Sequence, residues 1–202
     1  MDFVPLSLDI ETSTSDLDGQ ILSIGVVRFD NGENRYIEIR HEKLVVSPES
    51  MAVNRFNVTT LNDNKKYYLH LADPLLQAFL TQYEEGTQII VHGAATSNII
   101  KEVKFIPMGF NVGSFDMSFV RKYLPMTAEK LGYRSIDLNA LIFAEAYKTG
   151  KNFYNLKRSY KKSAFDCAKK HASELEPHHA LFDCYIASGV FSLLTGIKPS
   201  WL

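Results

Sequence analysis

The first forty residues contain three runs of strand-forming residues separated by turns. These runs are Phe3 to Ile10, Gln20 to Phe29 and Arg35 to Ile39. Asp30-Asn31-Gly32 lies between the last two runs and is a strong signal for a hairpin turn. Three consecutive strands joined by short turns predict an antiparallel meander at the start of the chain.

Helical spacing of apolar residues becomes common after this meander. Asp73 is predicted to be an N-cap, because Pro74 follows it and proline is favoured at the first helical position. Ser114 to Tyr123 and Leu138 to Tyr147 are further helix candidates, and Asp137 is expected to cap the second of them. The strongest apolar stripe closes the chain, at Leu181, Cys184, Ala187, Val190, Phe191 and Leu194. Strands mixed with helices in this way predict an α/β domain with a mixed sheet.

Composition narrows the class of protein without indicating a function. A length of 202 residues suits one domain, and 46% hydrophobic residues exclude an intrinsically disordered chain. The net charge of −1 does not indicate a nucleic-acid-binding protein, although it is compatible with a local basic patch. Neither Cys167 nor Cys184 belongs to a metal-ligand pair, and no apolar run approaches the ~20 residues of a membrane span. The start of the chain also lacks the pattern of a signal peptide, so we expect a cytoplasmic protein with no membrane partner.

Candidate chemistry begins with two acidic residues at the end of the first strand. In Leu8-Asp9-Ile10-Glu11, alternation places both carboxylates on one face of the strand. Burying two carboxylates side by side is costly unless a cation lies between them, and divalent cations prefer carboxylate oxygens. Taken alone, this pattern occurs often by chance and is more typical of a solvated strand end.

Two further motifs carry acidic residues near the starts of predicted helices. Asp116 follows a strand and a turn, and Asp183 lies in the first turns of the last helix. His178 lies in the loop just before that helix. Each residue also has a purely structural interpretation, since an aspartate in a first turn stabilises the helix dipole.

The order of these motifs resembles the DEDDh family of 3'→5' exonucleases. That family includes the proofreading subunit of bacterial DNA polymerase III, RNase T and oligoribonuclease. Asn111 with Phe115-Asp116 is similar to the family's N-x-x-x-F-D, and the segment from Ser47 to Phe56 looks like the proofreading-type enzymes. Phe119 to Pro125, together with Tyr133 to Asp137, looks like oligoribonuclease. The resemblance covers the chain from Leu6 to about Leu194.

The resemblance implies an RNase H-like α/β fold, with a mixed central sheet of five or slightly more strands flanked by helices. It implies a single exonuclease domain over residues 1–202. It also implies that Asp9, Glu11, Asp116 and Asp183 hold two divalent ions, Mg²⁺ or Mn²⁺, at each active site. His178 would be the general base, because imidazole can take a proton from water at neutral pH. A sister group has tyrosine at the position of His179, which we expect to be a helix-surface residue.

The chain departs from the family before its central motif. Ile89 to Ala95 resembles the start of that motif but contains no aspartate. The motif with Asp116 comes about twenty residues later, so we predict an insertion near residues 87–104.

Residues that would contact a nucleic-acid strand fall into two groups. Basic residues between Lys151 and Lys170 alternate with aromatic residues, which suits binding of a single strand, although a charge run is also typical of a solvated helix face. The candidates in this group are Lys157, Arg158, Lys161 and Lys162. The candidates around the terminal nucleotide are Thr12, Leu17, Met51, Asn54, Phe56, Asn111 and Phe115.

The leading hypothesis is a Mg²⁺- or Mn²⁺-dependent exonuclease that acts at the 3' end of a single strand, with DNA favoured over RNA. Its products would be nucleoside 5'-monophosphates. An oligoribonuclease-like enzyme is the first alternative, and a catalytically inactive nucleic-acid-binding domain is the second. By analogy with similar enzymes, a homodimer is possible.

Overall fold

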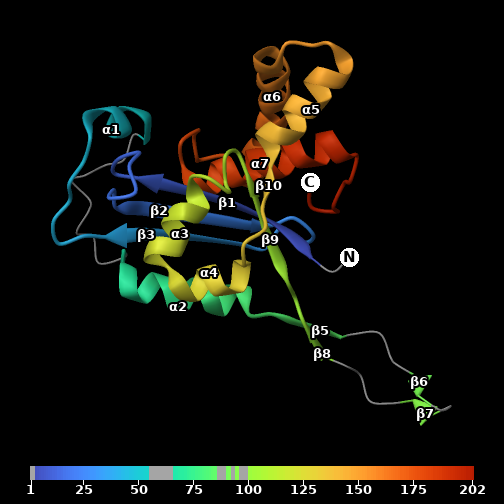
Figure 1. The fold of residues 1–202 in the computed structure, drawn as a ribbon, viewed down its shortest axis with the longest axis horizontal. Helices are drawn as coiled ribbons and strands as arrows, with labels where there is room; N and C mark the ends of the chain where they lie inside the picture. Colours follow the sequence, from blue (N-terminus) through green and yellow to red (C-terminus); the bar gives the residue numbers. More distant parts are fainter. Residues whose placement is uncertain (1–2, 55–65, 86–89, 92–93, 96–99) are drawn as a thin grey trace.

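A mixed six-stranded sheet forms the centre of the computed structural model, which describes residues 3–54, 66–85, 90–91, 94–95 and 100–202. The strand order is β10-β9-β1-β2-β3-β4 (Figure 1). These strands are β1 (Val4–Thr12), β2 (Ile21–Arg28), β3 (Asn34–Arg40), β4 (Tyr67–Tyr68), β9 (Phe105–Gly109) and β10 (Ile136–Asp137). The first three strands are antiparallel, while β9 runs parallel to β1 and β10 parallel to β9. The predicted meander and mixed sheet are therefore confirmed.

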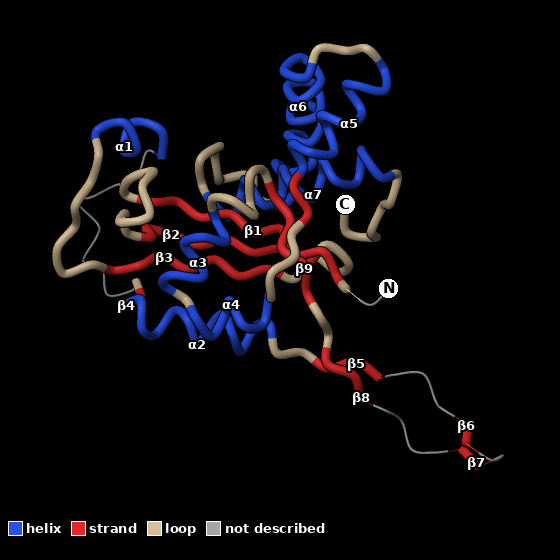
Figure 2. The backbone as a smooth tube through the Cα atoms, viewed as in Figure 1, coloured by secondary structure: helices blue, strands red, loops and turns tan. Residues whose placement is uncertain are grey.

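Helices cover both faces of this sheet. They are α1 (Pro48–Asn54), α2 (Leu69–Leu80), α3 (Asp116–Tyr123), α4 (Pro125–Leu131), α5 (Leu138–Thr149), α6 (Phe153–His171) and α7 (Ala180–Thr195). The helices α2, α3 and α4 lie on one face, and α7 packs against β1 and β2 on the other with α6 behind it (Figure 2). The charge run after Lys151 proves to be one helix, α6, which was not among the predicted helices.

Side chains along β1 alternate between the hydrophobic core on one face of the sheet and helix α7 on the other. Leu6, Leu8 and Ile10 are buried in the core that β1 shares with α2, α3 and α4. Ser7 points to the opposite face, where its hydroxyl lies 2.7 Å from the hydroxyl of Ser188 on α7. Asp9 and Glu11 follow Ser7 in the same alternation, so β1 presents both carboxylates on the side that α7 covers.

The predicted start of the second helix was wrong. The helix α2 begins at Leu69, and Pro74 lies inside it. The buried carboxylate of Asp73 accepts hydrogen bonds from the backbone N–H groups of Met126 (3.0 Å) and Thr127 (2.8 Å). Asp73 therefore caps α4, which packs alongside α2, and not its own helix.

The segment before β9 forms a narrow antiparallel ribbon. Its strand β5 (Tyr83–Glu85) pairs with β8 (Ile100–Glu102), and β6 (Ile90–Val91) pairs with β7 (Ala94–Ala95). The ribbon extends away from the layers of the domain (Figure 1). It overlaps the segment predicted as an insertion near 87–104, and its origin as an insertion stays a prediction.

Within the described part of the chain, no helix has both the length and the apolar character needed to cross a membrane.

Candidate active site

Acidic residues from three distant parts of the chain meet where β1 ends. Asp9 and Glu11 come from β1, Asp116 is the first residue of α3, and Asp183 lies in the first turn of α7. The backbone N–H of Ile10 donates a hydrogen bond to Oδ1 of Asp116 at 3.0 Å. This bond joins segments separated by 106 residues and fixes the Asp116 carboxylate beside the two acids of β1.

A glycine on β2 allows α7 to approach the sheet closely. Gly25 is the partner of Asp9 in the β1–β2 register. A Cβ atom at Gly25 would lie 2.5 Å from the carbonyl carbon of Ala180, so any side chain here would push the start of α7 away. The thiol of Cys184 lies 3.1 Å from the carbonyl oxygen of Gly25. The missing side chain thus lets Asp183 reach the acids of β1.

His178 stands beside two of these acids. One ligand atom from each of Glu11, His178 and Asp183 lies within 4.8 Å of the other two. The backbone N–H of His178 donates to Oδ2 of Asp183 at 3.1 Å. His178 has a left-handed backbone (φ 67°) and an exposed side chain, so it stands at the open rim of the site. The structure therefore brings together all five residues that the motifs suggested for catalysis.

Burial is the main obstacle to ionising the acids of this cluster, and repulsion among the acids adds to it at Asp9 and Glu11. Burial raises the pKa of Asp9 well above its usual value, and Asp116, Asp183 and Glu11 raise it further. Burial, followed by the charges of Asp183 and Asp116, raises the pKa of Glu11 to about 8. Burial likewise raises the pKa of Asp116 to about 7 and the pKa of Asp183 above its usual value. Several carboxylates that resist ionisation together fit a site for divalent cations, whose charge would offset the repulsion.

The basic helix α6 contributes positive charge at the edge of the cluster. Lys161 lowers the pKa values of Asp9 and Asp183, in opposition to their burial. The ammonium groups of Lys157 and Lys161 lie 5.2 and 4.4 Å from the ring centre of Phe110. Arg158 and Lys162 are exposed one position further along the helix. The four predicted basic residues thus separate into a pair beside Phe110 and a pair on the adjacent helix face.

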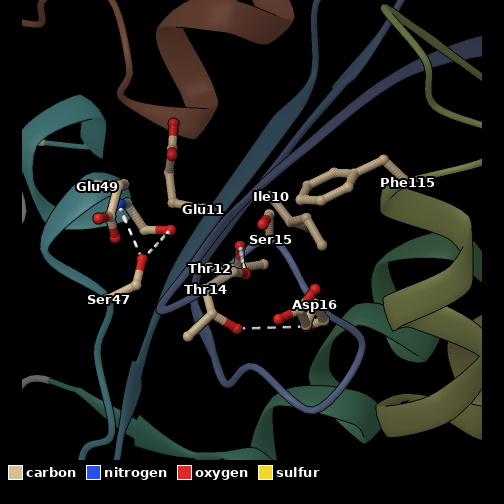
Figure 3. A pocket seen from close by; sticks show the side chains of 10 residues that line it. Ile10, Glu11, Thr12, Thr14, Ser15, Asp16, Ser47, Glu49 and Phe115 are labelled. Carbon is tan, nitrogen blue, oxygen red and sulfur yellow. Dashed lines mark hydrogen bonds between the residues drawn. The ribbon is translucent and has the colours of Figure 1, made fainter.

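A hollow of about 660 Å³ opens next to Glu11 (Figure 3). Two predicted substrate contacts, Thr12 and Phe115, line it. The other lining residues are mainly hydroxyl and acidic side chains, at Thr14, Ser15, Asp16, Ser47, Glu49 and Ser50. Ser47, Glu49 and Ser50 belong to the segment from Ser47 to Phe56 that resembles the proofreading-type enzymes, but they were not predicted as substrate contacts, because their approach to Glu11 depends on the path of the chain between β3 and α1.

The remaining predicted contacts lie elsewhere or outside the described side chains. Leu17 is 48% exposed, and its carbonyl oxygen accepts hydrogen bonds from Lys122 (2.7 Å) and Tyr123 (3.0 Å). The side-chain oxygen of Asn111 accepts from Asn139 at 2.7 Å, which ties the β9–α3 loop to α5. The side chains of Met51 and Asn54, and the whole of Phe56, lie outside the described part of the structure.

Two further predictions, for Asp137 and His179, had opposite outcomes. Asp137 accepts the backbone N–H of Asn139 at 2.8 Å, which confirms it as the N-cap of α5. The expectation that His179 is a helix-surface residue was wrong. Its ring is half-buried and stacks on Tyr36 at 4.3 Å, and burial lowers the pKa of His179.

Comparison with known proteins relates this chain to others through its fold. No family model and no curated protein sequence matches it. The zinc-bound complex of Escherichia coli exonuclease I with single-stranded DNA aligns with all of the chain at a TM-score of 0.64 and 13% identity. The complex of that enzyme with a dA16 oligonucleotide aligns with 98% of the chain at a TM-score of 0.60 and 13% identity. A product-bound exonuclease I aligns with all of it at a TM-score of 0.61 and 14% identity.

The chain spans 42% of the first two of these proteins and 45% of the third. Identities this low show a shared architecture. The mixed sheet, with three antiparallel strands and three more strands that each pair parallel to a neighbour, is confirmed as the RNase H-like α/β fold, which this chain has in common with exonuclease I.

Proposed function

We propose that this chain is a metal-dependent 3'→5' exonuclease acting on single-stranded nucleic acid, with DNA favoured over RNA. The observation that carries the proposal is the convergence of four carboxylates and one histidine from opposite ends of the chain. The shared fold supports it, because the exonuclease I structures include complexes with single-stranded DNA.

Asp9, Glu11, Asp116 and Asp183 would hold the divalent cations, Mg²⁺ or Mn²⁺, with two ions per site. When bound, such ions supply charge that activates water and stabilises the leaving oxygen at phosphorus. Hydrogen bonds within the chain hold two of these carboxylates in position: the backbone N–H of Ile10 donates to Asp116, and the backbone N–H of His178 donates to Asp183. Preorganised acids need not rearrange when charge develops at the phosphate.

His178 would take a proton from the attacking water. Its position at the exposed rim, next to Glu11 and Asp183, allows contact with both solvent and a bound phosphate. Imidazole is suited to proton transfer at neutral pH, so the role matches the residue type.

The hollow beside Glu11 would receive the 3'-terminal nucleotide. The ring of Phe115 offers a stacking surface for the base, and the hydroxyl groups around it offer hydrogen bonds to the sugar. Lys157 and Lys161 would attract the phosphates that precede the scissile bond. Cleavage at this position releases nucleoside 5'-monophosphates.

The test offers DNA and RNA oligomers, labelled at either end, in Mg²⁺, Mn²⁺ or EDTA. We expect stepwise shortening from the 3' end that EDTA abolishes, and at least a ~100-fold loss of rate in Asp116→Asn. Asp166→Asn, which changes an exposed acid on α6, is the matched control and should retain full activity. Faster cleavage of short RNA than of DNA would favour the oligoribonuclease-like alternative. Binding without cleavage would favour the inactive domain, and an unchanged rate in Asp116→Asn would refute the proposal.

A further inference from the structure

A second hollow lies at the tip of the α5–α6 hairpin, away from the acids. Its volume is about 380 Å³, and its aromatic lining consists of Phe143, Tyr147 and Phe153. Phe143 is 61% exposed and Tyr147 is 86% exposed, and exposed apolar side chains that gather in one patch often mark an interaction site. Lys151 adds a positive charge to the same lining. The hollow therefore combines flat apolar surfaces with a cation.

The ends of the two helices give this hollow a defined shape. Gly150 takes a left-handed conformation (φ 68°) and ends α5. Asn152 then caps α6 by accepting the backbone N–H of Asn155 at 3.1 Å. This tight connection brings the ring of Phe153 to 6.2 Å from the ring of Phe143 across the hairpin. The aromatic walls are thus held in place by regular backbone structure.

A continuous row of cations and rings joins the hollow to the acids. The Lys157 ammonium lies 6.0 Å from the ring centre of Phe153 and 5.2 Å from that of Phe110. Lys161 lies 4.4 Å from the Phe110 ring on the side towards the acids, where its charge reaches Asp9 and Asp183. Positive charge therefore leads from the candidate active site along α6 to the aromatic hollow.

The length of this row matches a short stretch of strand. Lys161 lies eight residues after Phe153, which is about 12 Å along a helix with a rise of ~1.5 Å per residue. A stacked strand advances ~3.4 Å per nucleotide, so the row would span roughly three or four nucleotides, and fewer if the strand is extended.

We propose that the hollow at the tip of the α5–α6 hairpin is a second nucleobase site, which holds a base several nucleotides away from the scissile bond. Lys157 and Lys161 contact the intervening phosphates. This inference rests on the proposed function. Base stacking on aromatic rings does not depend on sequence, so the site distinguishes long strands from short ones and not one base from another.

Strand length is the variable that tests the second site. The value of kcat/KM is measured for a twelve-residue oligothymidylate and for a dinucleotide, using the full chain with Mg²⁺. We divide kcat/KM for the twelve-residue oligomer by kcat/KM for the dinucleotide. Tyr147→Ala and Phe143→Ala each lower this ratio at least ~5-fold, because stacking of one base on an aromatic ring strengthens binding by that factor or more. Tyr133→Ala is the matched control, since Tyr133 is 78% exposed and does not line the hollow. An unchanged ratio in both tip variants overturns the proposal.

A binding measurement separates this proposal from the proposed function. If the parent chain cleaves no oligomer, the proposed function fails, but fluorescence anisotropy with the same two labelled oligomers still tests the hollow. The tip variants are then expected to weaken binding of the long strand at least ~5-fold. The tip could instead join two copies of this chain. Tyr147→Ala would then change the molar mass in solution and leave strand binding intact, which would overturn the nucleobase site.

Discussion

At the scale of single residues, the candidate site depends on carboxylates that are difficult to ionise together. Glu11 and Asp116 have pKa values raised to about 8 and about 7, with burial as the main cause in both. Such a site is unfavourable when empty and deprotonated. It becomes favourable when divalent cations replace the protons, so metal binding, protonation and folding are linked.

The linkage predicts how stability depends on pH. A carboxyl group with a folded-state pKa above its unfolded value stabilises the fold fully only below the unfolded pKa, and this contribution is lost as the pH rises through the folded pKa. We therefore expect the Tm of the metal-free chain to fall from about pH 5 to about pH 8.5. Glu11→Gln should recover roughly 2 to 5 kcal/mol at the upper end of this range.

Calorimetry in EDTA measures this effect, with Glu42→Gln, an exposed acid, as the control. Added Mg²⁺ should raise the Tm more at the upper end of the range than at the lower end, because protons no longer compete. If Glu11→Gln follows the same pH dependence as the unchanged chain, the cost of ionising the buried Glu11 carboxyl group is not what limits stability.

A second residue-scale prediction distinguishes the two adjacent histidines. His178→Ala should lower kcat by about 10²- to 10⁴-fold, the usual contribution of a general base, while Mn²⁺ affinity stays nearly unchanged. His179→Ala removes the stacking on Tyr36 and should mainly cost about 0.5 to 1.5 kcal/mol of stability. Kinetics and thermal unfolding of both variants check this. If His179→Ala is the variant that loses kcat, the assignment of the base is wrong.

The order and spacing of the motifs, matched to those of the DEDDh exonucleases that they resemble, were sufficient to select the five clustered residues from the sequence. They were insufficient for Gly25 and His179, because the roles of these residues arise from neighbours on other elements. Gly25 matters through the backbone of Ala180, and His179 is half-buried because Tyr36 on β3 lies against its ring. A lone glycine inside an apolar strand was the available signal for the first. No local pattern indicated the second.

At the scale of elements, the distance between α7 and the sheet determines whether Asp183 joins the cluster. Gly25→Ala should force the start of α7 outward and cost about 1 to 3 kcal/mol. It should also weaken Mn²⁺ binding by about 10- to 100-fold, the range seen when the support of a metal ligand is disturbed.

Val190→Ala is the matched control for this change. It truncates a buried side chain further along α7 and should cost about 2 kcal/mol without moving the start of the helix. Thermal unfolding and Mn²⁺ titration of both variants separate the two effects. Equal Mn²⁺ affinity in Gly25→Ala and Val190→Ala would show that close packing at Gly25 is not needed for the site.

The start of a helix was predictable where the capping residue directly precedes that helix. It was less predictable where the capping residue belongs to another helix. Asp137 caps the helix that follows it directly, and its role was predicted correctly. Asp73 was predicted to do the same but caps α4 across an interhelical contact. Its helix begins four residues earlier, at Leu69, and its first turns include the fully buried Ala72. Tertiary packing of this kind overrides a local N-cap signal.

At the scale of the whole molecule, the meander and the α/β class followed from the order of strand and helix patterns. The complete sheet order did not, because the parallel pairings of β9 with β1 and of β10 with β9 join distant segments. The protruding α5–α6 hairpin was not predicted either. Apolar residues do recur at helical spacing along α6, at Phe153, Leu156, Tyr160, Ala164 and Ala168, but the many basic residues between them obscured this stripe. The topology nevertheless brings the ends of β1, α3 and α7 to one place.

The most direct test of the account is anomalous diffraction from crystals soaked in Mn²⁺. We expect two peaks, each within about 2.5 Å of carboxylate oxygens from Asp9, Glu11, Asp116 or Asp183. This expectation would be contradicted by crystals saturated with Mn²⁺ that show no peak among these four side chains, or peaks only at other acids on the surface.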